Sequence, residues 1–129
     1  MLKLHVLDSL YPHSRNVAHA VEVPPGARLL FTNGQTGTKL DGSTPESIEE
    51  QAVVVFERLK TILEAANMTL QDIVCLNTYL TDEGDTQIFL DVRDRVMGDH
   101  KPASTFFFIT ALVRPELKIE IEAVAAKVN

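Results

Sequence analysis

The chain has 129 residues, of which 45% are hydrophobic and 23% are charged. This length suits one domain, spanning residues 1–129, with a hydrophobic core of its own, and no apolar run is long enough to cross a membrane. The net charge of −6 opposes attraction to nucleic-acid phosphates and to anionic membranes, so we expect neither as a partner. A single cysteine, Cys75, excludes an internal disulfide, and the N-terminal segment does not resemble a secretory leader. Both features predict a cytoplasmic protein.

Three short strands are predicted first, from residues that alternate between apolar and polar. They cover residues 2–7, 18–23 and 28–32, and residues 8–17 between the first two indicate a loop. The third strand runs into Asn33-Gly34. This dipeptide is typical of a hairpin turn, because both residues tolerate a positive φ.

A long helix follows, with its entry in the segment from Asp41 to Pro45. Ser43 or Thr44 is the expected N-cap, and Pro45 suits the first helical position. Apolar residues then recur at helical spacing up to about Ala66. Asn67 is expected to end the helix in the left-handed conformation, and residues 69–72 indicate a short capped turn.

The second half of the chain alternates strands with one more helix. Residues 73–80 are predicted as a strand, 85–97 as a helix, and 105–112 and 119–128 as two further strands. Groups of strands around two helices favour an α+β fold. We expect a mixed six-stranded sheet with both helices packed on one face.

The strand predicted at residues 105–112 is unusual because it offers no polar face. Phe106, Phe107 and Phe108 are consecutive, so phenylalanine rings point to both sides of the sheet. Helices cover one side, and the other would form an exposed apolar patch in a monomer. We expect a second copy of the chain to cover it; the alternative is burial by loops of the same chain.

Several segments together resemble the Rid family of reactive intermediate deaminases, also called YjgF-like proteins. They occur in the family's order and span essentially the whole chain: Leu30-Phe31-Thr32-Asn33-Gly34-Gln35, Ser47 to Ala52, Leu59 to Ala66, Leu76 to Asp82, Pro102-Ala103-Ser104-Thr105, and Ile119 to Ala125. The resemblance implies a chorismate-mutase-like α+β fold and a homotrimer with clefts between subunits. It also implies hydrolysis of enamines and imines released by pyridoxal-phosphate enzymes, with a small-molecule ligand in each cleft and neither a metal nor an organic cofactor.

The family's site residues are only partly retained. The resemblance places Glu120 at the position of the glutamate in the family's last strand. We expect it to be catalytic, by accepting a proton or orienting water. The remaining substrate-binding positions carry other residues here: Ser104 replaces an arginine, Val17 a tyrosine, Asn33 (next to Gly34) a serine, Leu90 an asparagine and Phe106 a cysteine.

The exchange at position 104 bears most directly on function. An arginine binds a carboxylate through two charge-assisted hydrogen bonds, whereas serine offers one neutral hydroxyl. Losing such a bond weakens binding roughly 10- to 100-fold. The sequence therefore predicts a larger, more apolar or uncharged ligand than the usual 2-iminopropionate.

Other residues with functional chemistry have simpler interpretations. Arg15 and Arg114 suit solvated loops, and Arg93 and Arg95 suit a salt-bridged helix surface beside Asp91 and Asp94. His19 is the one histidine expected near the cleft, and the four histidines lack the spacing of a metal site. Three functions stay open: a divergent enamine or imine hydrolase, a trimer that binds a small ligand without chemistry, and an RNA-directed activity, which the net charge opposes.

Overall fold

The computed structural model describes residues 1–12 and 17–129. Its strands and helices are, in chain order, β1 (Lys3–His5), β2 (Ala20–Glu22), β3 (Arg28–Phe31), β4 (Gln35–Thr36), α1 (Ile48–Ala65), β5 (Ile73–Leu80), α2 (Thr86–Met97), β6 (Ala103–Phe108) and β7 (Ile119–Lys127). Short 3-10 turns at Leu70–Asp72 and Glu83–Asp85 precede β5 and α2.

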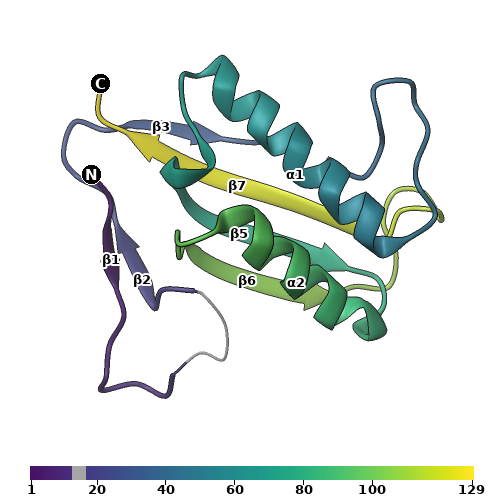
Figure 1. The fold of residues 1–129 in the computed structure, drawn as a ribbon, viewed down its shortest axis with the longest axis horizontal. Coiled ribbons are helices and arrows are strands. Elements are labelled where there is room, and N and C mark those ends of the chain that lie inside the picture. The colour runs from purple at the N-terminus through teal and green to yellow at the C-terminus, as the bar shows by residue number, and fades with distance from the viewer. Residues whose placement is uncertain (13–16) are drawn as a thin grey trace.

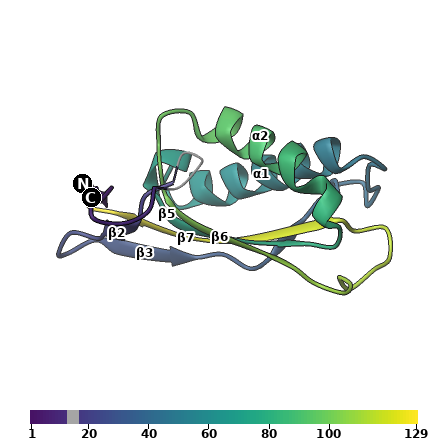
Figure 2. The ribbon, with the colours of Figure 1, turned by 90° about the horizontal axis from the view of Figure 1, so that it is seen from below.

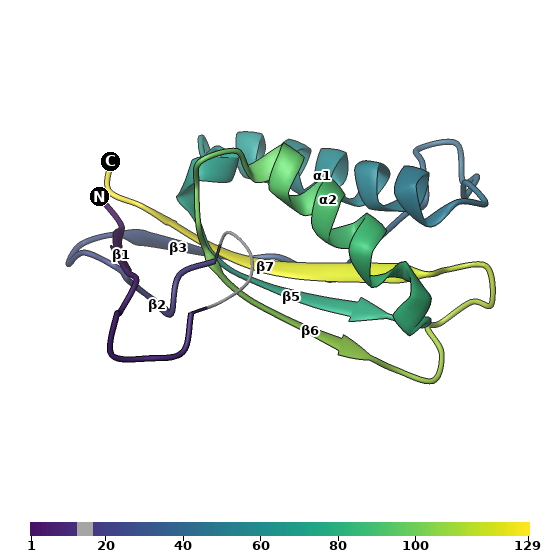
Figure 3. The same cartoon turned by 60° about the horizontal axis from the view of Figure 1, so that its bottom comes forward.

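The elements form a sheet with two helices on one of its faces (Figure 1). The sheet order is β3-β7-β5-β6, and β4 also pairs with β7. Strands β5 and β6 are parallel, and the other pairs are antiparallel. Figure 2 and Figure 3 show α1 and α2 side by side over the same face. The expected α+β fold with a mixed sheet is therefore confirmed.

The expected number of strands in that sheet is wrong. Among the described residues, the main sheet has five strands, and β1 pairs with β2 in a separate two-stranded sheet. Pro24 and Pro25 follow β2, and neither can donate a backbone hydrogen bond to a ladder. Gly26 then takes a φ of 79°, so the chain turns away before β3 begins.

The hairpin predicted at Asn33-Gly34 is also wrong. Strands β3 and β4 both pair with β7, at Phe31↔Val124 and then at Gln35↔Ile121, so the chain continues in one direction. Neither Asn33 nor Gly34 has a positive φ, which a two-residue hairpin turn of type I′ requires at both positions. The dipeptide interrupts one long edge strand instead of reversing it.

Helix α1 begins later than predicted. Ser47 is the N-cap, and its Oγ accepts a hydrogen bond from the N–H of Glu50 at 3.1 Å. Pro45 lies before the helix, and its carbonyl accepts a hydrogen bond from the buried side-chain amide of Gln51. The C-terminal end agrees with the prediction: Asn67 is left-handed with a φ of 57°, and Thr69 and Asp72 form a capping box.

The core lies between the helices and the face of the sheet that they cover. Strand β7 illustrates how the core is formed, because its side chains at every second position point toward the helices. Ile119 and Ile121 are fully buried under the helices. Phe106 of β6 packs edge-on against Phe89 of α2, with ring centroids 5.8 Å apart. Each such large side chain contributes about 1.5–3 kcal/mol when fully buried.

The opposite face of the sheet carries apolar side chains that neither α1 nor α2 covers. Register places Leu29, Phe31 and Phe107 on it, and these are 55%, 69% and 48% exposed. Figure 2 shows this face as the side of the sheet away from both helices. Exposed apolar groups of this size are typical of a surface that meets another molecule, so burial by the chain's own loops does not account for these three residues.

Candidate functional site

Glu120, the residue expected to be catalytic, lies on the uncovered face of the sheet. It pairs with Tyr79 of β5 and with Thr36 of β4, and it is half-buried. Ile119 and Ile121 on either side of it point into the core, so alternation alone sends the Glu120 carboxylate outward. The strand thus fixes the backbone of Glu120 and directs its side chain to the uncovered face.

Gly34 lies directly beside the Glu120 carboxylate. A Cβ atom added at Gly34 would overlap Glu120 Oε2 and would lie 2.8 Å from its Cδ. The neighbouring Asn33 uses its carbonyl to accept a hydrogen bond from Gln35 at 3.1 Å, and its side chain is exposed. The structure therefore brings together three of the predicted site residues, Glu120, Gly34 and Asn33.

A second carboxylate on the same face is paired with a tyrosine that the sequence analysis missed. The Tyr79 hydroxyl donates a hydrogen bond to Glu122 Oε1 at 2.5 Å, and this bond is the main reason that the pKa of Tyr79 is raised. The Tyr79 ring stacks on Phe107 with centroids 5.8 Å apart. The alternation of β5 predicts that Tyr79 points away from the core. Its hydrogen bond to Glu122 depends on the β5-β7 register, which pairs Tyr79 with Glu120 and places Glu122 diagonally beside it.

Ser104 lies on the other face of the sheet, beneath α2. It pairs with Leu76, which is fully buried in the core. Its Oγ accepts a hydrogen bond from Arg93 Nη1 at 3.2 Å. Because this bond uses a lone pair of the hydroxyl, the Ser104 hydrogen is left to donate to another group.

Arg93 is buried, although the sequence predicts a salt-bridged residue on the helix surface. Its pairing with Asp94 is present, with Nη2 at 3.2 Å from Oδ1, but the Arg93 side chain is only 4% exposed. Its guanidinium also lies 5.8 Å from the ring centroid of Phe89. A cation therefore lies beside residue 104 although that residue is not an arginine, and Asp94 balances its charge.

The remaining predicted positions lie close to this second group. Leu90 and Phe106 are partly buried and pack against the core. Val17 is half-buried, and the N–H of Ala18 next to it donates to the carbonyl of Pro102 at 3.2 Å. Ser104, Phe106, Leu90 and Val17 thus form a group at the β6 edge of the sheet.

The predicted site residues therefore form two groups on opposite faces. Asn33, Gly34 and Glu120 lie at the uncovered face, and Ser104 and Phe106 point toward the helices. Side chains on opposite faces of one sheet are separated by its backbone, so they do not line one cleft within a single chain.

The other candidates have structural roles or lie outside the described residues. His19 accepts a hydrogen bond from the N–H of Leu7 at Nδ1, and its Nε2 contacts the carbonyl of Tyr11 at 3.3 Å. Arg15 lies outside the described residues. Burial is the main cause of the raised pKa of the Cys75 thiol. Within residues 1–12 and 17–129, no group of histidine, cysteine, aspartate or glutamate side chains could hold a metal ion, and no helix could span a membrane.

Comparison with known proteins identifies the family to which the chain belongs. The sequence profile of the family described as Endoribonuclease L-PSP matches residues 8–127. The chain belongs to this family. The resemblance to Rid proteins is also confirmed, because the crystal structure of the Rid family protein YyfB from Yersinia pestis superimposes with a TM-score of 0.87. The two chains are 28% identical, and the match covers 98% of each.

Two curated relatives show how far the sequence similarity extends. Protein HMF1 of Saccharomyces cerevisiae is 30% identical over 123 residues, covering 95% of this chain and 92% of HMF1. The Escherichia coli K12 protein TdcF, whose name proposes a reactive intermediate deaminase, is 27% identical over 103 residues, or 77% of this chain and 79% of TdcF. The family thus includes proteins named for deaminase chemistry.

Proposed function

We propose that this protein hydrolyses an enamine or imine in clefts between the subunits of a cytoplasmic homotrimer. The observation that carries the proposal is the position of Glu120, a carboxylate held on the uncovered face of the sheet against the bare backbone of Gly34. Family membership supports the chemistry, and the exposed Phe31 and Phe107 support assembly through this face.

A trimer would bring together the two groups of residues that lie on opposite faces of the sheet within one chain. Within one chain, Glu120 and Ser104 belong to opposite faces of the sheet, and Ser104 lies on β6, the edge strand of the sheet order. If the β6 edge of one subunit meets the uncovered face of the next, Glu120 and Ser104 would line one cleft. Repetition of this contact around a three-fold axis would form three equal clefts.

The chemistry requires one group that moves a proton. As water adds to the carbon of the C=N bond, Glu120 would accept a proton from the water and deliver it to the nitrogen. In the resulting carbinolamine, Glu120 would accept the hydroxyl proton and pass it to the amino nitrogen. The C–N bond breaks as ammonia leaves, a C=O bond forms, and the carboxylate is regenerated. An enamine would first be protonated on carbon. Such acid–base catalysis contributes about 10²- to 10⁴-fold.

The groups around Ser104 favour a bulky apolar substrate. Leu90 and Phe106 offer no hydrogen bonds, and Ser104 offers one hydroxyl. Arg93 lies behind Ser104, and its charge is balanced by Asp94. A small imino acid such as 2-iminopropionate would gain little here, whereas a larger side chain would gain apolar contact.

The experiment compares imines released in situ by an amino acid oxidase. We expect the protein to accelerate ammonia release from the leucine- and phenylalanine-derived imines much more than from the alanine-derived imine. Acceleration that is equal for all three, and unchanged in Glu120→Gln, would contradict the proposal.

A second function is a homotrimer that binds a small ligand without chemistry. The apolar side chains at positions 17, 90 and 106 favour it, because they remove polar groups that could orient water. Saturable binding of a ligand that competes with these imines, without any acceleration of ammonia release, would support this alternative.

A further inference from the structure

A separate cavity with a volume of about 780 Å³ lies where α1 faces the segment that follows β3. Its lining residues are Gln35, Thr36, Thr38, Lys39, Leu40, Val54, Glu57, Arg58, Thr61, Ile62 and Arg114. This volume lies within the range of about 300–1,000 Å³ that is typical of small-molecule sites. Glu120 and Ser104 are not among the lining residues, so the cavity is distinct from the proposed catalytic cleft.

The charge of the lining differs from that of the whole chain. Lys39, Arg58 and Arg114 contribute three positive charges, and Glu57 contributes one negative charge. The chain as a whole carries a net charge of −6. A local excess of cations in an acidic protein attracts anions to that place.

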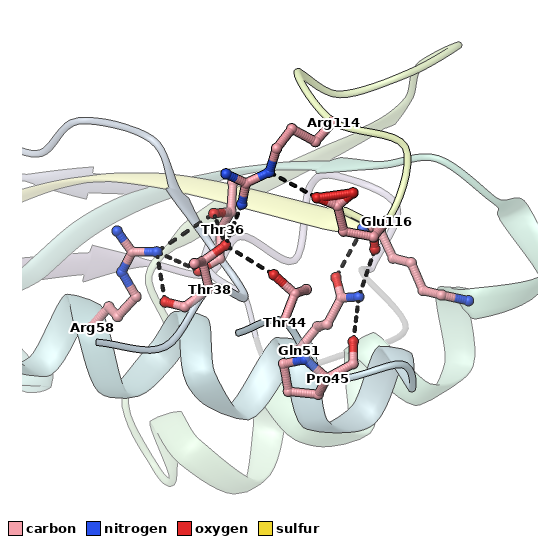
Figure 4. A network of polar contacts seen from close by, with 9 residues as sticks. Thr36, Thr38, Thr44, Pro45, Gln51, Arg58, Arg114 and Glu116 are labelled. Carbon is pink, nitrogen blue, oxygen red and sulfur yellow. Dashed lines mark hydrogen bonds and ion pairs between the residues drawn. The ribbon is translucent and has the colours of Figure 1, made fainter. Parts of the chain in front are cut away.

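Arg58 is the central cation of the cavity. It is half-buried, and its Nη1 donates hydrogen bonds to the carbonyls of Thr36 at 2.9 Å and Thr38 at 3.0 Å (Figure 4). No carboxylate in the described part of the chain forms an ion pair with Arg58, and its Nε and Nη2 have no hydrogen-bond acceptor there. These nitrogens can therefore bind an anion.

Arg114 approaches the same segment from the loop before β7. Its Nη2 donates to Thr38 Oγ1 at 2.8 Å, and its Nε lies 2.8 Å from Glu116 Oε1. Figure 4 shows Arg58 and Arg114 on opposite sides of Thr36 and Thr38. Two cations that contact one residue repel each other, and an anion bound between them would relieve that repulsion.

The segment that carries Thr36 and Thr38 packs against a buried, hydrogen-bonded side chain of α1. The side chain of Gln51 is fully buried and donates to the carbonyls of Pro45 at 2.8 Å and Glu116 at 2.9 Å, and its Oε1 accepts from the N–H of Lys118. Gly37 packs so closely on Gln51 that an added Cβ would lie 2.8 Å from its Cα. The two arginines are thus positioned before any ligand binds, which lowers the entropic cost of binding.

We propose that this cavity binds a small organic anion with an apolar body. A carboxylate head would lie between Arg58 and Arg114 and accept hydrogen bonds from both guanidinium groups. Val54 and Ile62 of α1, with Leu40 opposite, would contact the apolar body. The positive lining selects against a neutral ligand of the same shape.

The test uses hexanoate and its neutral analogue hexanamide in titrations of ¹⁵N-labelled full-length protein. We expect hexanoate to shift the amide resonances of Thr36, Thr38 and Leu40, and to bind about tenfold or more tightly than hexanamide, because only hexanoate makes charge-assisted hydrogen bonds. Arg114→Met should weaken hexanoate binding by a similar factor while leaving the Arg58 bonds to the loop intact. Arg58→Met should weaken it at least as much.

Arg95→Met is the matched control, because Arg95 is an exposed arginine outside the cavity. It should bind hexanoate like the unmodified protein. Equal affinity for hexanoate and hexanamide, no loss in Arg114→Met, or shifts confined to residues outside the cavity would each overturn the proposal. Because the readout is equilibrium binding, it does not depend on whether Glu120 catalyses any reaction.

Discussion

The two faces of β7 differ in burial because apolar and polar residues alternate along the strand. On one face, Ile119, Ile121, Ala123 and Ala125 pack under the helices and are almost fully buried. On the other, Glu120 and Glu122 lie half-buried on the surface that neither α1 nor α2 covers. The apolar residues under the helices stabilise the fold, whereas the carboxylates on the uncovered face contribute little to the core.

Substitutions on the two faces should therefore have different effects. Changes on the covered face or beneath α2 should lower the free energy of unfolding, because they leave cavities or unpaired charges in the core. Changes on the uncovered face should affect activity and assembly, and should leave the fold of one chain nearly unchanged.

The largest effect is expected from Glu120→Gln, which keeps the size of the side chain and removes its ability to carry a proton. Ammonia release from the leucine-derived imine should fall about 100-fold or more. Glu122→Gln is the matched control, two residues along the same strand and on the same face, and should lose much less activity. If the two variants lose activity equally, Glu120 has no special role.

Arg93→Met should cause the largest loss of stability among the polar changes. The variant removes the ion pair with Asp94, whose side chain is 17% exposed, and breaking a buried pair typically costs about 3–5 kcal/mol. Because Asp94 retains some contact with water, we expect about 2–4 kcal/mol in chemical denaturation. Arg95→Met removes a surface contact and should cost less than about 1 kcal/mol. Similar losses in both variants would show that Arg93 is not buried.

Two glycine substitutions should separate the two kinds of effect. Gly37→Ala would press a methyl group against the backbone of Gln51 and should cost about 1–3 kcal/mol of stability. Gly34→Ala would meet only the flexible end of Glu120, so stability should change by less than about 1 kcal/mol. Activity should fall instead, by about tenfold or more, because the carboxylate is displaced. The reverse pattern would contradict the assigned positions of both glycines.

The smallest effect concerns alkaline stability. The hydrogen bond to Glu122 raises the pKa of Tyr79 in the folded chain, so the folded state holds this proton more strongly than the unfolded state does. The resulting stabilisation is present below about pH 10 and is lost as pH rises through the raised pKa. Tyr79→Phe should flatten this part of the stability curve, and Tyr11→Phe, at a residue that is 92% exposed, should not. An unchanged curve in Tyr79→Phe would contradict the assignment.

Periodic segments of the sequence were predicted well. The strand at residues 73–80 has the predicted bounds, and the helix predicted at 85–97 begins one residue later. Both have strong apolar periodicity, which follows directly from packing against one core. The left-handed Asn67 was also predicted, because the residue type itself favours that conformation.

The errors fall where local residue preferences compete with tertiary contacts. Asn33-Gly34 favours a turn, but pairing of β3 and β4 with the same strand keeps the chain extended. Pro45 favours a helix start, but its carbonyl binds Gln51 and Ser47 caps the helix instead. The cation near Ser104 could not be predicted either, since Arg93 is brought there by the packing of α2 on β6, and charge spacing along α2 indicates only its pairing with Asp94.

Mixed trimers test the central claim most directly, namely that Glu120 of one subunit and Ser104 of another complete each cleft. Glu120→Gln removes one half of the site, and Ser104→Asp repels the substrate carboxylate at the other half while remaining compatible with Arg93. Each variant alone should be inactive toward the leucine-derived imine. After equal amounts are unfolded and refolded together, about a quarter of the clefts should carry both intact residues, and about a quarter of the activity should return. A mixture that stays as inactive as the separate variants would contradict the shared cleft.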